Sequence, residues 1–221
     1  MAITERVILS VSGGVEEWKD DLKVMLQTLK AQDGYLRTRW GPHSEDQQKL
    51  ELLIGWESTE ALATFKGKFP PHCSTLVLIS TKNIYLTLHN RNPRFPRNVN
   101  PSEIKPHCPP NIVIIEFKPY APKEVIDAHF VQMLTIEQGA SSEDDLRAQV
   151  TKFKDLEGCT GVASGLSKDD VDGKGKVFIA AVGWESLEAS EKAKESKVVV
   201  LSGAESHHVN FRFPIKGFRG L

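Results

Sequence analysis

A four-residue sequence that occurs twice limits the fold of this chain more than any other feature. Gly-Trp-Glu-Ser occupies residues 55–58 and again residues 183–186. Each copy follows an apolar run, and each precedes a short stretch with helical character. A strand-to-helix junction that recurs in both halves predicts that one folding unit was built twice in the chain.

The first half contains the pattern of one complete unit. Apolar residues between 15 and 32 recur at the spacing of an amphipathic helix, and the runs on either side favour strands. Ser58 or Thr59 is the expected N-cap of a second helix. The predicted elements are a strand at 6–11, a helix at 15–32, strands at 35–40 and 49–56, a helix from 58 to about 69 and a strand at 84–89. This β-α-β-β-α-β order is that of the ferredoxin-like fold.

The second half predicts the same order with one addition. Residues 93–110 are rich in proline and are interpreted as a stiff linker between a first unit at 1–92 and a second at 111–221. Residues 123–138 have helical spacing and have no counterpart in the first half, so they predict an extra helix. The other expected elements are a strand at 111–117, a helix at 142–156, strands at 159–166 and 177–184, a helix at 186–196 and a strand at 208–213.

Composition excludes several classes of partner. The 221 residues carry a net charge of −1, which gives no electrostatic basis for binding nucleic acid or an anionic membrane. No apolar run approaches the ~20 residues of a membrane-spanning helix. The three cysteines are far apart, without the spacing of a zinc site or a disulfide framework. With no secretory signal at the N-terminus, we expect a reduced, cytoplasmic protein.

The residues around the two copies resemble a known family. A Trp followed by Ser-x-Glu-Ala opens the second helix in the antibiotic-biosynthesis-monooxygenase-type branch of the dimeric α/β-barrel superfamily. The matching positions here are Trp56, Ser58, Glu60 and Ala61 in the first copy, and Trp184, Ser186, Glu188 and Ala189 in the second. The resemblance implies an α+β fold in which two ferredoxin-like units pack sheet to sheet as an intramolecular α/β barrel. The chain would then be a monomeric pseudo-dimer or a weak homodimer.

The same resemblance implies a function. Members of this family include cofactor-independent monooxygenases, cyclases and isomerases of small aromatic or polyketide-like compounds, with ligand clefts between a sheet and its helices. A second class of function is a non-catalytic, stress-related or small-ligand-binding barrel. Heme-degrading members carry a heme-ligating His after the strand-exit Trp, and no His stands at that spacing here, so we expect no cofactor.

Histidines are the candidate acid–base groups, because imidazole titrates near neutral pH. His208, Asn210 and Arg212 alternate along the last predicted strand, so their side chains would share one face and could bind a phenolate or carboxylate. A solvated face of an edge strand is the simpler interpretation. Tyr85 and His89 share a face of the equivalent strand in the first half, where they could serve as an acid–base pair or could simply form the solvated face of an edge strand.

Three further groups of residues have a structural and a functional interpretation. His129 falls on the apolar side of the predicted extra helix, where a histidine is more often a core residue than a catalytic one. Trp56 and Trp184 could form cleft walls, although large aromatics at such junctions usually fill the core. His43 is expected to be exposed in a turn. Two His-Cys pairs, at 72–73 and 107–108, lie among prolines, and adjacent residues rarely ligate one metal ion.

Overall fold

The computed structural model describes residues 1–218 except 69–109 and the single positions 12, 138, 140, 172, 174, 197, 198, 200, 202 and 217. Within this part the chain forms two four-stranded antiparallel sheets. The predicted strand containing Tyr85 and His89, the two His-Cys pairs and the linker up to residue 109 lie outside the described residues. No helix in the described part is long and apolar enough to cross a membrane.

The first sheet has the strand order β2-β3-β1-β4. Its strands are β1 (Ile3–Ser10), β2 (Tyr35–Pro42), β3 (Lys49–Trp56) and β4 (Asn111–Ile115), and its helices are α1 (Val15–Lys30) and α2 (Thr59–Gly67). Trp18, Leu22 and Leu26 repeat at helical spacing along α1 and are buried against the sheet together with Leu52 and Ile54 of β3. The predicted amphipathic helix and third strand are therefore confirmed.

The second sheet has the equivalent order, β6-β7-β5-β8. Its strands are β5 (Phe130–Glu137), β6 (Cys159–Leu166), β7 (Val177–Trp184) and β8 (Glu205–Val209). Its helices are α5 (Glu143–Thr151), which continues into the 3-10 turn η3 (Lys152–Asp155), and α6 (Leu187–Ser196). A four-residue helix, α4 (Lys123–Ile126), precedes the sheet in the chain.

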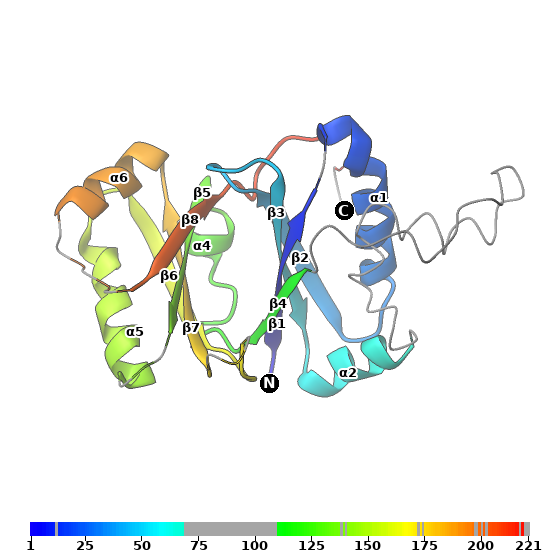
Figure 1. The fold of residues 1–221 in the computed structure, drawn as a ribbon, viewed down its shortest axis with the longest axis horizontal. Coiled ribbons are helices and arrows are strands. Elements are labelled where there is room, and N and C mark those ends of the chain that lie inside the picture. Colours follow the sequence, from blue (N-terminus) through cyan, green and yellow to red (C-terminus); the bar gives the residue numbers. More distant parts are fainter. Residues whose placement is uncertain are drawn as a thin grey trace, which may run out of the picture.

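The two sheets face each other, with α1 and α2 outside one and α5 and α6 outside the other (Figure 1). Short bridges link their edges. At one edge, Lys118 in the segment after β4 and Ser164 in β6 exchange backbone hydrogen bonds. At the other edge, where β2 meets the end of β8, the Ser44 amide donates to the His208 carbonyl and the Asn210 amide donates to the Pro42 carbonyl. An apolar layer that includes Ile115, Val131, Met133 and Ile179 fills the space between the sheets. The predicted fold class, two ferredoxin-like units packed sheet to sheet, is confirmed.

The repeated Gly-Trp-Glu-Ser sequence has the same structural role in both units. Trp56 and Trp184 end β3 and β7 and are fully buried. Ser58 and Ser186 accept hydrogen bonds from the amides of Ala61 and Ala189, which caps the helix that follows. The glutamates between them donate their amides to the carbonyls of Gly34 and Gly158, at 2.8 and 2.9 Å. The motif is thus a strand-to-helix junction, used twice in one geometry.

Three predicted elements are wrong in position or type. The strand expected to begin the second unit, 111–117, is β4, which pairs with β1 and completes the first sheet. The predicted helix at 123–138 is helical only at Lys123–Ile126, and Phe130–Glu137 is the central strand β5. The last strand ends at Val209 instead of continuing to 213, because the Asn210 amide bonds to Pro42 of the other sheet.

Candidate functional site

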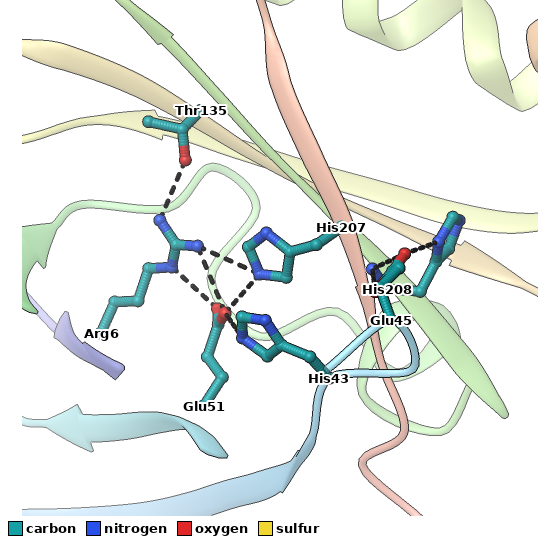
Figure 2. Close-up of polar contacts among 7 residues, drawn as sticks. All are labelled: Arg6, His43, Glu45, Glu51, Thr135, His207 and His208. Atoms are coloured by element: carbon teal, nitrogen blue, oxygen red, sulfur yellow. Dashed lines mark hydrogen bonds and ion pairs between the residues drawn. The ribbon is translucent and has the colours of Figure 1, made fainter. Parts of the chain in front are cut away.

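A polar cluster lies inside the barrel, close to where β8 meets the turn after β2. His207 and His208 are neighbours on β8, so their side chains point to opposite faces of the sheet. His207 points into the barrel toward Arg6 and Glu51 of the first sheet (Figure 2). His208 points outward toward helix α6, where it contacts Ser190. Adjacent residues therefore belong to two separate polar clusters, His207 to one inside the barrel and His208 to one next to α6.

Glu51 is the centre of the interior arrangement. Its carboxylate receives two hydrogen bonds from the guanidinium of Arg6, at 2.8 and 3.2 Å, and lies 2.7 Å from Nε2 of His207. Nε2 of His43 is 3.3 Å from the same carboxylate, and the two imidazole rings stack with centroids 4.0 Å apart. Arg6 also donates to the Thr135 hydroxyl of the second sheet at 3.0 Å. The cluster joins the two sheets by polar contacts.

The charge of Glu51 is balanced locally. Its side chain is fully buried, which would raise its pKa. The positive charge of Arg6, the hydrogen bonds from His207 and Arg6, and the His43 imidazole 3.3 Å away outweigh burial, so the pKa of Glu51 is held well below its ordinary value. Glu51 is therefore an anion at neutral pH, and the barrel holds it together with the Arg6 cation.

The same residues could be considered as a metal centre. One ligand atom each from His43, Glu51 and His207 lies within 4.8 Å of the others. However, the imidazole planes differ by only 15° and are stacked, whereas two histidines that bind one ion must each direct a ring-plane lone pair at it. The Arg6 guanidinium already supplies the positive charge beside this carboxylate. The geometry fits a guanidinium-balanced cluster better than a metal site.

His208 is the centre of the outer arrangement. Its Nδ1 lies 2.7 Å from the carboxylate of Glu45, which also accepts the His208 backbone amide, and its Nε2 lies 2.8 Å from the hydroxyl of Ser190. Burial raises the pKa of Glu45, but the hydrogen bonds from His208 outweigh it and lower that pKa. The polar contacts continue through Gln132, which accepts from the indole of Trp184 at 3.1 Å.

Carboxylate, imidazole and hydroxyl in this order are the groups of a nucleophilic triad. A nucleophile must reach its substrate, and Ser190 is only 2% exposed, on the side of α6 that packs against the sheet. The chain of contacts instead connects the exposed Glu45 with a buried polar group under α6. These contacts tie α6, β8 and the β2–β3 turn together.

A cleft of about 290 Å³ opens between the start of α1 and the β2–β3 turn. Trp18, Pro42 and Phe213 provide its apolar surface, and Gln47 and Gln48 provide side-chain amides. The other lining residues are Gly13, Gly14 and Val15. The family resemblance implied a ligand cleft between a sheet and its helices, and this cleft lies at one end of that layer in the first unit.

A smaller cavity of about 50 Å³ lies between the two sheets. Thr4 and Leu53 of the first sheet and Ala163 and Ala181 of the second contribute to its lining, as do residues of the segment that follows β4. Tyr120 from that segment and Arg37 and Arg39 from β2 are its polar side chains, apart from Thr4. The cavity is too small for a multi-ring aromatic compound.

The predicted site residues do not come together. Trp56 and Trp184 are fully buried and line neither cavity described above. His129 is exposed, in the loop between α4 and β5, so its predicted place on an apolar helix face is wrong because the helix ends before it. Tyr85 and His89 lie outside the described residues.

His208, Asn210 and Arg212 do not share one strand face. Only His208 is in β8. Asn210 and Arg212 lie in the turn after it, where the Asn210 side chain accepts the Arg212 amide at 3.0 Å. The predicted three-residue polar face is therefore wrong, since the strand ends at Val209 when the chain crosses to the other sheet.

Sequence reasoning missed Arg6, Glu51, Glu45 and Ser190, and it wrongly predicted that His43 is exposed. His43 is 5% exposed and belongs to the interior cluster. One signal was present in the sequence: Glu51 interrupts the apolar run of the strand predicted at 49–56, and a buried carboxylate requires a partner. The partner, Arg6, sits on a strand whose pairing with β3 only the fold reveals.

Similarity to known proteins is found at the level of structure. No family model matches the sequence, and no curated protein matches it. An anthrone oxidase-like protein superposes with a TM-score of 0.58 at 11% identity, over 94% of this chain and 90% of its own. A candidate monooxygenase from Fusobacterium nucleatum subsp. nucleatum ATCC 25586 gives a TM-score of 0.51 at 11% identity, over 95% and 91%.

A candidate chlorite dismutase superposes over 95% of each chain with a TM-score of 0.51 and 10% identity. Identities this low show a common fold and carry no information about substrate. The agreement extends over nearly the whole of this chain and includes both sheets. The chain therefore has the same overall fold as these three structures, with both four-stranded sheets supplied by one chain.

Proposed function

We propose that this protein binds a small, planar, hydroxylated aromatic compound in the cleft between α1 and the β2–β3 turn. The observation that carries the proposal is the cleft itself, about 290 Å³ with Trp18 and Phe213 in its lining. That volume is just below the ~300–1,000 Å³ typical of ligand pockets, which suits one or two fused rings. Aromatic walls favour planar ligands through offset or edge-to-face ring contacts.

Polar groups at the cleft would orient such a ligand. The side-chain amides of Gln47 and Gln48 can donate to or accept from a phenolic hydroxyl. Gly14 is the N-cap of α1 and contributes no side-chain cap, and its carbonyl accepts the first-turn amide of Glu17 at 3.0 Å. The described lining residues contain no histidine, carboxylate or other acid–base group. Their chemistry supports binding more directly than catalysis.

Binding of 2-naphthol, measured by isothermal titration calorimetry, tests the proposal. Phe213→Ala removes a cleft wall and should weaken binding by about tenfold, the equivalent of ~1.4 kcal/mol. Arg212→Ala is the matched control, because Arg212 is an exposed neighbour that does not line the cleft. Equal losses in both variants, or no binding of any hydroxylated aromatic by the unmodified protein, would refute the assignment of the cleft.

A second candidate function is cofactor-independent oxygenation, cyclisation or isomerisation of the bound compound. The observation that favours it is the Glu45–His208 pair, since Glu45 belongs to the same turn as the cleft residues Gln47 and Gln48. A carboxylate-oriented imidazole can act as a general base for a phenolic proton, which here requires Nε2 of His208 to exchange its 2.8 Å contact with Ser190 for the ligand. This function requires turnover, detected as oxygen consumption or as a new product by mass spectrometry, that His208→Gln abolishes while affinity is retained. If the compound binds but no turnover is detected, ligand binding is the only one of the two candidate functions that is supported.

A further inference from the structure

The chain that follows β8 leaves the second unit and reaches the first. It crosses from the end of β8 to the side of α1 (Figure 1). On this path the Asn210 amide donates to the Pro42 carbonyl at 3.2 Å, the last backbone contact between the two units in the described residues. Beyond it, partly buried and exposed residues alternate. The partly buried ones are Phe211, Phe213 and Ile215, and the exposed ones are Arg212, Pro214 and Lys216. The apolar side of this segment therefore faces the protein.

Phe218 attaches the far end of the segment to the first unit. Its ring packs against Trp40 of β2 with centroids 5.3 Å apart, and Trp40 makes an edge-to-face contact with Trp18 of α1 at 6.3 Å. Ile215 and Phe218 both pack against the core of the first unit. Phe213 lies between the two ends of the segment and lines the cleft between α1 and the β2–β3 turn, as does Trp18. The segment therefore supplies a wall of the cleft and is attached both before and after that wall.

Side chains, and not a backbone ladder, hold this segment on the first unit. In the described part of the chain, its backbone hydrogen bonds beyond Pro42 join its own residues: the Phe213 amide donates to the Asn210 carbonyl, and the Phe218 amide donates to the Ile215 carbonyl. A segment with few backbone and apolar contacts opens at a lower free energy than the whole protein. The segment can therefore detach while both sheets stay intact.

Detachment would change the cleft directly. It would remove the Phe213 wall and the Phe218 ring that packs on Trp40, the neighbour of the cleft residue Trp18. We propose that residues 211–216 and Phe218 form a C-terminal strap: attached at Trp40, it retains a ligand in the cleft, and detached, it releases the ligand. The second unit thereby controls a site in the first. The identity of the ligand rests on the proposed function, whereas detachment of the strap can be measured without a ligand.

Limited digestion with trypsin measures detachment. Arg212 and Lys216 are exposed cleavage sites inside the strap, and a protease cuts a folded segment through its opened form. Phe218→Ala removes the contact with Trp40 and alters no residue that lines the cleft. The variant should be cut at these two sites about tenfold faster. Its urea unfolding midpoint should stay nearly unchanged, because the lost contact lies outside the strand pairing of both sheets.

A second measurement without ligand reports on the cleft itself. Trp18 is only 3% exposed, so its indole N–H should exchange with solvent faster in Phe218→Ala, while that of Trp184 in the second unit should not change. Val24→Ala is the control, because it shortens an apolar side chain of the same helix that is already 41% exposed. It should change neither cleavage nor exchange. Phe218→Leu keeps part of the apolar contact and should give intermediate rates, which an unfolded variant would not.

The ligand 2-naphthol tests retention. At ten times its Kd it should slow cleavage at Arg212 and Lys216 about tenfold, because it stabilises the attached form by mass action. Phe218→Ala should release 2-naphthol about tenfold faster in stopped-flow fluorescence, with its association rate constant within twofold of that of the unmodified protein.

Two results would overturn the strap. The first is cleavage and Trp18 exchange that Phe218→Ala leaves unchanged, whether or not 2-naphthol binds. The second is faster cleavage together with release of 2-naphthol at the unmodified rate, since the segment would then detach without controlling the cleft. Failure of 2-naphthol to bind the unmodified protein refutes the proposed function instead, and the trypsin and Trp18 measurements then decide whether the strap opens the cleft.

Discussion

Substitution of Gly55 by alanine should destabilise the protein through a single contact, that with Tyr120. Gly55 lies in β3 without a positive φ, so its backbone accepts alanine. The new Cβ would meet Tyr120 Oη at 2.2 Å, while the next atoms, from Arg37 and Leu36, are at 3.5 Å. Overpacking of this kind typically costs about 1–3 kcal/mol, and the tyrosine can reduce this cost only by leaving its place under Arg37.

A double-mutant cycle isolates that contact. In Gly55→Ala combined with Tyr120→Phe the hydroxyl is absent, and the added methyl meets only ordinary contacts, so most of the lost stability should return. The expected coupling is about 1–3 kcal/mol by urea denaturation followed by tryptophan fluorescence. Gly67→Ala, where a Cβ meets nothing within 4 Å, is the control and should be neutral or slightly stabilising. Additive effects of the two substitutions, or an unchanged Gly55→Ala variant, would refute the reasoning.

Two further predictions concern the interior cluster and the repeated caps. Glu51→Gln leaves the Arg6 guanidinium without its buried partner and should cost about 3–5 kcal/mol in thermal or urea unfolding. Because the pKa of Glu51 is lowered in the folded state, its contribution to stability is present above its ordinary pKa of about 4.5 and is lost as the pH falls below that value. The Glu51→Gln variant should therefore lose this part of the acid sensitivity. Identical curves of unfolding free energy against pH for the variant and the unmodified protein would contradict this prediction. Ser58→Ala and Ser186→Ala should each cost about 0.5–2 kcal/mol, by similar amounts, since each removes a 3.2 Å cap hydrogen bond. A large effect in only one unit would show that the two junctions are not equivalent.

The repeated motif was sufficient to predict the two-unit architecture, because a strand exit, an N-cap and a buried tryptophan are local features. The helical pattern at 15–32 and the strand at 159–166 were predictable for the same reason. The strand at Phe130–Glu137 was not predictable from its sequence pattern. It is buried on both faces, so its apolar residues do not alternate and fit a helical spacing equally well. The strand at 111–115 was recognised, but no local pattern indicates which sheet a strand joins.

The candidate sites depend still more on tertiary structure. Arg6, Glu51 and His207 come from three strands, and His207 belongs to the opposite sheet from the other two. Their association requires the closed barrel, which sequence spacing does not encode. His208 was a candidate in the sequence because imidazole titrates near neutral pH. However, the strand that carries it ends at Val209, because the chain crosses to β2 there, and so Asn210 and Arg212 do not share its strand face.

The most direct test of the central claim, that an aromatic ligand binds between α1 and the β2–β3 turn, uses the four tryptophan indole N–H resonances in a ¹H–¹⁵N correlation spectrum. Trp18 lines the cleft, whereas Trp184 donates its indole N–H to Gln132 deep in the second unit. Titration with 2-naphthol should shift the Trp18 resonance in a saturable manner and leave the Trp184 resonance in place. A saturable shift of Trp184 with no change at Trp18, or no saturable shift at any tryptophan, would contradict the account.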